Sequence, residues 1–252
     1  MSVPLKPLNW YKKLALKKGR LEAGAFIVEG ERAIMQIIDS HPDELVEILT
    51  IDEPNPVYRR YPLRFLTRAQ FRSICSTVTP QGIMAVVNLP RGIYSEKLPD
   101  NTGNKILLLE DIQDPGNLGM LIRTAAAFDY SGVIMTENCA DPLSPKCVQA
   151  TMGTVLSLWL RKTSNYLGIV GNLRKNDYRL VATELNGMES PSIIGQQKKL
   201  LLALGNEAAG LSPELLEAAD YRIRIPIICE KAESLNVAAC GAICMYLSSQ
   251  IS

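Results

Sequence analysis

The second half of the chain contains short apolar runs separated by helical patterns, and this feature limits the possible folds most strongly. Runs of about five residues that are apolar almost throughout are typical of strands buried on both faces. Helices between such strands favour parallel pairing. The sequence therefore predicts an α/β fold with a parallel sheet. The runs cover 105–109, 132–135, 155–160, 179–183, 200–204 and 221–225, and a helix over 234–248 ends the chain.

The first ninety residues predict a smaller α/β unit. Apolar residues at helical spacing indicate a helix over 32–38, and Thr67 is a suitable N-cap for a helix that runs to residue 74. Strand patterns cover 45–51 and 83–87. This alternation again favours a sheet covered by helices.

Residues 89–104 separate the two patterns and are rich in proline, glycine and asparagine, which is typical of a linker. A chain of 252 residues is long enough for two domains with their own cores. We therefore expect one domain over 1–88, a linker over 89–104 and a second domain over 105–252.

Composition excludes several classes of protein. The apolar fraction is 47% and the charged fraction 21%, as in ordinary globular proteins. No apolar stretch is long enough to span a membrane, and residues 1–20 lack the apolar segment of a signal peptide. Six scattered cysteines without a C-x-x-C pair, and the single His41, argue against a metal site. We expect a reducing compartment such as the cytoplasm, with no membrane and no metal partner.

The start of the chain is strongly basic. Residues 1–20 contain six lysines and arginines and no acid, with Trp10 and Tyr11 among them. Phosphate groups attract such a segment, and aromatic side chains stack on exposed bases. A solvent-exposed helical face is the alternative explanation. The nucleic-acid contacts predicted here are Lys12, Lys13, Lys17, Lys18 and Arg20.

Three loops that follow predicted strands carry small and polar residues. They cover 110–119, 205–210 and 226–236. Ligands bind beyond the carboxyl ends of parallel strands, where these loops meet. None of the loops matches a dinucleotide or P-loop fingerprint. Each also has a purely structural explanation; Ser234, for example, is a suitable N-cap for the last helix.

These loops carry three sequence motifs that resemble the signatures of the SpoU family, which are TrmH-like RNA ribose 2′-O-methyltransferases of the SPOUT superfamily. The motifs occur in the family's order across residues 105–252. Their segments are 117–119 with 123–128, 204–207 with 210–212, and 225–226 with 234–237. The sequence departs from the usual pattern at Asp129 and Cys229, where glycine is common.

The first domain is similar, more loosely, to the family's substrate-binding domain, which is related to kink-turn-binding ribosomal proteins. Residues 17–20 and 26–30 carry this similarity. The two-domain arrangement resembles the ribosomal branch of the family, so ribosomal RNA is the expected substrate. The expected compartment is then the cytoplasm or an organelle with its own ribosomes.

The resemblance implies S-adenosylmethionine (SAM) as cofactor, a trefoil knot in the second domain, and a homodimer whose active site uses both subunits. It also implies that loop backbone groups hold the cofactor's adenine. By motif position these are Gly205, Ile225 and Leu235, with Leu204 and Asn206 in the same loops.

The resemblance also places catalysis on the motif residues Asn117, Arg123, Glu207, Ser234 and Asn236. Methyl transfer to a hydroxyl requires a proton acceptor. In the family the arginine at position 123 is often described as the base. Since guanidinium stays protonated, a bidentate hold on the target phosphate is the alternative, with a phosphate oxygen or water accepting the proton.

The other polar motif residues would orient the ribose and the arginine. Glu207 would anchor this network or bind the amino group of the cofactor, and the sequence leaves both roles open. The alternatives to a ribosomal RNA methyltransferase are a transfer-RNA methyltransferase, an inactive RNA-binding or assembly factor, and a small-molecule methyltransferase or NAD enzyme. The intact motif residues argue against the second, and the last lacks its fingerprint.

Overall fold

Six apolar segments of the second half form one parallel sheet in the computed structural model, which describes residues 6–228 and 230–250. Neighbouring strands pair in parallel in the order β10-β8-β9-β5-β6-β7. The α/β prediction is confirmed. The strands are β5 (Lys105–Leu109), β6 (Gly132–Thr136), β7 (Trp159–Thr163), β8 (Arg179–Thr183), β9 (Leu200–Leu204) and β10 (Tyr221–Ile223).

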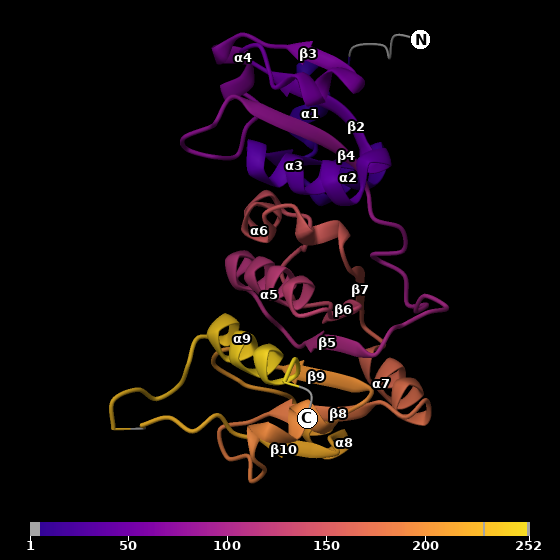
Figure 1. Ribbon diagram of the computed structural model, residues 1–252, viewed down its shortest axis with the longest axis vertical. Helices are drawn as coiled ribbons and strands as arrows, with labels where there is room; N and C mark the ends of the chain where they lie inside the picture. Colours follow the sequence, from indigo (N-terminus) through magenta and orange to yellow (C-terminus); the bar gives the residue numbers. More distant parts are fainter. Residues whose placement is uncertain (1–5, 229, 251–252) are drawn as a thin grey trace. The chain divides into compact units, whose positions relative to one another are not determined.

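Helices cover both faces of this sheet (Figure 1). Helices α7 and α8 share a core with Ile106, Leu108 and Leu201 on one face. On the other face α9 packs closely against α5 and β9. The contact is close at Gly241, where an added Cβ would lie only 2.3 Å from Leu121 Cδ2 and 2.8 Å from Leu204 Cδ1. The helices are α5 (Pro115–Ala127), α7 (Tyr166–Lys175), α8 (Pro213–Ala218) and α9 (Val237–Leu247), with a 3₁₀ turn η4 (Pro191–Gln196).

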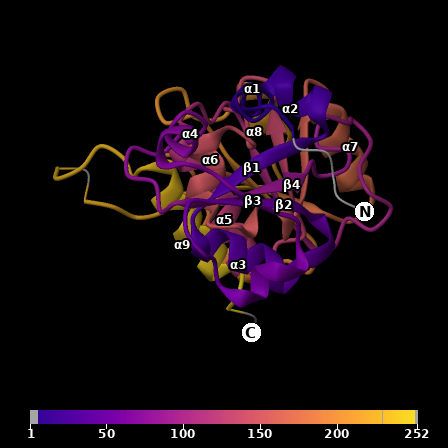
Figure 2. The ribbon, with the colours of Figure 1, turned by 90° about the horizontal axis from the view of Figure 1, so that it is seen from above.

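The first part of the chain forms a four-stranded sheet in the order β1-β4-β2-β3, in which β4 pairs antiparallel with β1 and β2. In Figure 2, α3 and the α1–α2 pair appear on opposite sides of these strands. The strands are β1 (Ala25–Glu29), β2 (Leu45–Thr50), β3 (Leu63–Phe65) and β4 (Ile83–Asn88). The helices are α1 (Leu8–Lys13), α2 (Lys17–Ala23), α3 (Glu31–Ser40) and α4 (Arg68–Arg72), with 3₁₀ turns η1 (Pro42–Glu44) and η2 (Pro56–Arg60).

The two compact units are not contiguous in sequence. Unit 1 comprises residues 1–91 and 141–157, and unit 2 comprises 92–140 and 158–252. The segment 141–157 contains α6 (Pro145–Thr151) and the turn η3 (Thr154–Leu156). It joins unit 1 because the Arg20 guanidinium reaches the Asp141 carboxylate at 2.6 Å and α6 packs beside β1.

Two predicted elements are misplaced. The run 155–160 is a 3₁₀ turn followed by the start of β7, because Met152 and Gly153 adopt positive φ and reverse the chain after α6. The last helix begins at Val237 rather than residue 234, because the Asn236 side chain accepts hydrogen bonds from the amides of Ala238 and Ala239 and so caps it.

The position of one departure from the family pattern explains why glycine is common there. Asp129 has a φ of +59°, in the left-handed region that glycine adopts without strain. Cys229 lies outside the described residues, and the trefoil knot stays a prediction. In the described part of the chain, no helix combines the length and apolarity that a membrane crossing requires.

Candidate active site

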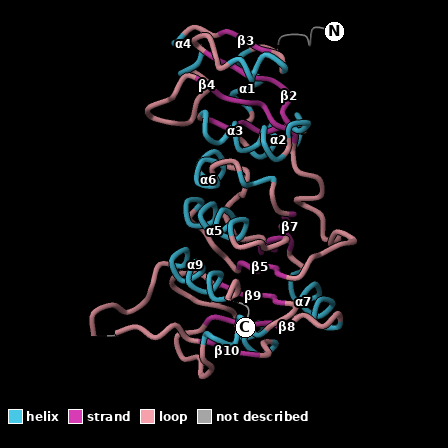
Figure 3. Tube along the Cα trace, viewed as in Figure 1, coloured by secondary structure: helices cyan, strands magenta, loops and turns pink. Residues whose placement is uncertain are grey.

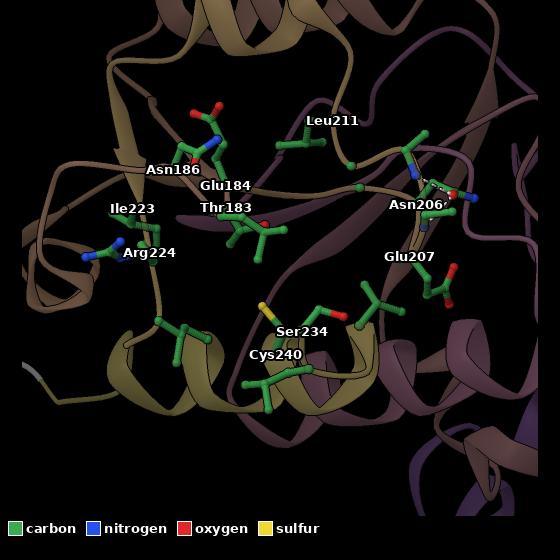
Figure 4. Close-up of a pocket in the computed structure, with 18 of the residues that line it drawn as sticks. Thr183, Glu184, Asn186, Asn206, Glu207, Leu211, Ile223, Arg224, Ser234 and Cys240 are labelled. Carbon is green, nitrogen blue, oxygen red and sulfur yellow. Dashed lines mark hydrogen bonds between the residues drawn. The ribbon is translucent and has the colours of Figure 1, made fainter. Parts of the chain in front are cut away.

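A cavity of about 310 Å³ opens where β8, β9 and β10 end and α9 begins. Two of the three loops predicted from the sequence line it, and the long connection from β10 to α9 is visible in Figure 3. Its walls are largely apolar. Figure 4 shows Glu184 and Asn186 at one end and Glu207 at the other. A mainly apolar cavity with polar groups at its ends is typical of a small-molecule site.

The loop after β9 is closed by its own hydrogen bonds. The Asn206 side-chain oxygen accepts from the amides of Ala208 (2.9 Å) and Ala209 (3.0 Å), and its amide group donates to the carbonyl of Asp111 (2.9 Å). A Cβ at Gly205 would lie 2.3 Å from the Gly210 backbone. Gly205 and Asn206 both line the cavity, but the Asn206 side chain is used to shape the loop.

The other residues predicted to hold the cofactor divide into two groups. Ile225 and Leu235 line the cavity, and their backbone groups make no hydrogen bond with any other described residue. Half-buried backbone groups without partners are available to a ligand. Leu204 is fully buried within β9 and does not line the cavity.

Three predicted catalytic residues form one hydrogen-bonded chain beside the cavity. Asn117 Nδ2 donates to Glu207 Oε1 at 2.6 Å, and Asn236 Nδ2 donates to Asn117 Oδ1 at 3.1 Å. Asn117 itself is held by its backbone amide, which donates to the N-cap carboxylate of Asp114 at 2.9 Å. The chain connects one residue from each of the three motifs.

The other two predicted catalytic residues lie outside this chain. The Ser234 hydroxyl lines the cavity and has no hydrogen-bond partner among residues 6–228 and 230–250. Arg123 is exposed on α5, and its side chain likewise makes no hydrogen bond or ion pair to a described residue. It lies six positions after Asn117 on the helix, which places it about 9 Å further along the axis and on a different face. Within one subunit, Arg123 is therefore apart from the network.

Cys240 belongs to none of the predicted site residues, although its side chain lines the cavity (Figure 4). A hydrogen bond from the buried Cys244 thiol, one turn further along α9, lowers the pKa of Cys240, although burial opposes this effect. Glu184 and Asn186 were also missed. They directly follow β8, so the rule that selected the other loops would have found them.

The basic residues at the start of the chain have different environments. Lys12, Lys13, Lys17 and Lys18 are exposed, as RNA contacts require. Arg20 is only 2% exposed, and its guanidinium donates to the carbonyls of Leu14 and Ala15 besides pairing with Asp141. Arg20 is therefore a structural residue in the interior of unit 1, and the prediction that it contacts RNA is corrected.

The sequence profile of the SpoU rRNA methylase family matches residues 104–246, and that of the MRM3-like substrate binding domain matches residues 9–85. The chain belongs to the SpoU rRNA methylase family. A relative of similar length is the 23S rRNA (guanosine(2553)-2'-O)-methyltransferase RlmP of Bacillus subtilis. It is 34% identical over 239 residues, which are 94% of this chain and 93% of that protein.

Solved SpoU structures share the fold. The methyltransferase AviRb from Streptomyces viridochromogenes, in complex with the cofactor AdoMet, superposes with a TM-score of 0.83 at 25% identity, over 96% of each chain. The AdoMet-bound rRNA methyltransferase from Sinorhizobium meliloti gives 0.79 at 26% identity, over 98% of this chain and 96% of that chain.

As predicted, this SpoU protein is an RNA methyltransferase that uses SAM. The residues around the cavity fit that cofactor. Carboxylates at its ends complement the positive charges of SAM, the apolar walls suit the adenosine, and the unpaired backbone groups of Ile225 and Leu235 are suited to adenine.

Proposed function

We propose that this protein methylates the 2′-hydroxyl of a ribose in ribosomal RNA. The observation that supports this most directly is the hydrogen-bond network of Glu207, Asn117 and Asn236, which joins all three motifs at the edge of the cofactor cavity. The similarity to a ribosomal RNA 2′-O-methyltransferase over 94% of the chain supports the substrate class.

On this proposal the residues of the protein's active site have distinct roles. SAM, when bound, supplies an electrophilic methyl group on a positively charged sulfur. The backbones of Gly205, Ile225 and Leu235 hold the adenine, and the Ser234 hydroxyl orients the ribose. Glu207 fixes the Asn117 amide so that its orientation does not fluctuate. Arg123 binds the target phosphate in a bidentate manner, and a phosphate oxygen or water accepts the proton.

The position of Arg123 is best explained by a homodimer that places it in the partner's site. Met120 lies one turn before it on α5 and is 45% exposed, while Ile243 (40%) and Tyr246 (51%) are exposed on the neighbouring α9. These large apolar side chains suit a two-fold interface. The interface would bring Arg123 of one subunit to the Asn117 network of the other.

Complementation tests this arrangement directly. Arg123→Ala and Asn117→Ala subunits are each expected to be inactive as homodimers. If Arg123 acts across the interface, a refolded mixture regains about a quarter of the parent activity, since half of the dimers are mixed and each has one intact site of two. Activity that stays at the level of the single variants would show that each site is built within one subunit, or that no dimer forms.

The substrate class is tested in cells. Mapping 2′-O-methylated riboses in total RNA from cells with and without the gene is expected to show one ribosomal RNA position that depends on it. A gene-dependent position in transfer RNA would overturn the ribosomal assignment. If no methylated ribose depends on the gene but the purified protein binds RNA, the result would favour an inactive binding factor.

A further inference from the structure

Unit 1 has a second basic stretch far from the start of the chain. Residues 54–95 contain six arginines and no aspartate or glutamate. Arg68 and Arg72 are exposed at positions i and i+4 of α4, and neither side chain makes a hydrogen bond or ion pair to a described residue. Like charges at this spacing repel one another and destabilise a helix. Such an arrangement is better suited to a surface that binds an external anion.

The fold brings this stretch to the same face as the basic start of the chain. Tyr11 of α1 and Phe71 of α4 belong to one core cluster that covers a single face of the four-stranded sheet. The outer sides of these two helices expose Lys12 and Lys13 on α1 and Arg68 and Arg72 on α4. Cations that are more than fifty residues apart in sequence therefore share one surface.

Arg64 of β3 packs against Tyr11 of α1 and adds a guanidinium to the same side of the sheet. Its guanidinium lies 5.1 Å from the centre of the Tyr11 ring and donates to the Tyr11 hydroxyl at 2.9 Å and to the carbonyl of Lys6. The acid that contacts this assembly is Glu47, which accepts from the Tyr11 hydroxyl at 2.8 Å. Arg64 offsets this single carboxylate, so the other four cations retain their charge toward solvent.

We infer that Lys12, Lys13, Arg64, Arg68 and Arg72 form one cationic face that binds the sugar–phosphate backbone of the RNA substrate. This inference rests on the proposed function for the identity of the polyanion. The face adds α4 and β3 to the N-terminal segment and excludes Arg20. RNA fits better than an acidic protein, because guanidinium groups pair with phosphate in a bidentate manner and this face belongs to a unit that matches a substrate binding domain.

The test uses the full-length double variant Arg68→Gln/Arg72→Gln and protein-free 23S rRNA transcribed from the Bacillus subtilis gene. Binding is measured by filter retention between 50 and 200 mM salt. Loss of two phosphate contacts is expected to reduce the slope of log K against log salt by about 2 and to weaken binding roughly 5–30-fold. SAM affinity is expected to stay unchanged, and the unfolding temperature is expected to stay the same or rise slightly, because the repulsion between the two arginines is removed.

Two matched variants distinguish the face from a general charge effect. Lys175→Gln/Lys198→Gln removes the same charge from exposed positions of unit 2 that precede β8 and β9, at the sheet edge opposite the cavity. It is expected to leave RNA affinity within about twofold. Arg68→Lys/Arg72→Lys is expected to retain most of the salt slope, because the charge remains.

The remaining outcomes separate this inference from the proposed function. An unchanged salt slope in Arg68→Gln/Arg72→Gln, with methyl transfer intact in the parent, would overturn the cationic face alone. Equal slope changes in the two glutamine variants would also overturn it. Normal binding to protein-free RNA with methylation lost only on ribosomal particles would assign the face to a protein partner. If the parent binds RNA through these arginines but transfers no methyl group, the face stands and the proposed function fails.

Discussion

Polar side chains beside the cavity of unit 2 form hydrogen bonds with one another, whereas the cationic side chains on α1 and α4 of unit 1 are exposed and have no partner in the described part of the chain. In unit 2, Asn117 links Glu207 and Asn236 with two hydrogen bonds. In unit 1, the side chains of Arg68 and Arg72 have no hydrogen bond or ion pair to the described residues. This difference corresponds to the proposed ligands, which are a reacting ribose hydroxyl in unit 2 and an RNA phosphate backbone in unit 1.

A reacting hydroxyl must be oriented within a fraction of an ångström, so its binding groups are held in place before it arrives. A polyanion instead supplies the counter-charges itself, so the cations that bind it remain hydrated and unpaired beforehand at little cost in free energy. Among the charged residues predicted to act in catalysis, Arg123 differs from Glu207, because it is exposed and its side chain has no partner among the described residues, like the cations of unit 1. The following predictions test this difference.

The largest effect is expected at Arg123. Arg123→Ala is expected to reduce methyl transfer more than 100-fold, and Arg123→Lys about 10–100-fold, or 1.4–2.7 kcal/mol, because lysine keeps the charge but lacks the planar fork. Isothermal calorimetry is expected to show parent-like SAM binding in both. If the lysine variant instead gains a rate step that titrates between about pH 8 and 10.5, residue 123 exchanges the proton and the clamp is wrong.

Gly205→Ala is expected to weaken SAM binding more than 10-fold. The new Cβ would meet the Gly210 backbone at 2.3 Å, so the loop that lines the cavity must open. Calorimetric titration with SAM measures the change. The control is Gly171→Ala, a helical position with no atom within 4 Å of the added Cβ. It is expected to keep SAM affinity and to raise the free energy of unfolding by about 0.5–1 kcal/mol. Equal SAM affinities in the two variants would contradict the role of the loop.

The thiols of the two units are expected to react at different rates. A hydrogen bond from Cys244 lowers the pKa of Cys240, whereas burial and the nearby Glu29 raise the pKa of Cys75 in unit 1. N-ethylmaleimide at pH 7.5 should therefore label Cys240 faster, since thiolate is the reactive form. Peptide mass spectrometry measures both rates. Saturating SAM is expected to slow labelling about fivefold or more at Cys240 alone; equal protection of Cys75 would show that the cavity is not the cause.

The smallest effect concerns a structural ion pair. Burial raises the pKa of Asp220, but hydrogen bonds from Arg174 and the Leu180 amide outweigh it, and the net pKa is lowered. Its contribution to stability is therefore present above the unfolded pKa of about 3.9 and is lost as the pH falls through the lower folded value. Asp220→Asn is expected to cost about 1 kcal/mol at pH 7 in urea unfolding and almost nothing near pH 2.

The exposed pair Arg59–Glu53 of unit 1 is the control for this measurement. Its two side chains are 65% and 66% exposed, so Glu53→Gln is expected to change the free energy of unfolding by less than about 0.5 kcal/mol at any pH. A larger effect at Glu53 than at Asp220 would contradict the expectation that the less exposed ion pair contributes more to stability.

The sequence by itself determined the strands and the chemistry of the loops. Three predicted strands of unit 2, over 105–109, 179–183 and 200–204, have the bounds found in the structure, because a strand whose middle is buried on both faces is apolar over most of its length. The motifs also indicated the catalytic class, which family membership confirms. The run 155–160 failed because a left-handed turn at Met152 and Gly153, which hydrophobicity does not encode, precedes it.

Only the tertiary structure decided which polar residues meet. Asn117 and Asn236 are 119 positions apart, and sequence spacing carries no information about a contact formed when parallel strands align. The same holds for Arg20, which lies in a basic segment but is a buried partner of Asp141. It also holds for Arg68 and Arg72, which the fold places on the same side of the sheet as Lys12. Local pattern fixes the type of element, because hydrogen bonding and apolar burial are periodic along the chain. Long-range packing decides whether a charged side chain is buried in an ion pair or exposed to a ligand, because its burial and its partners depend on which residues the fold places beside it.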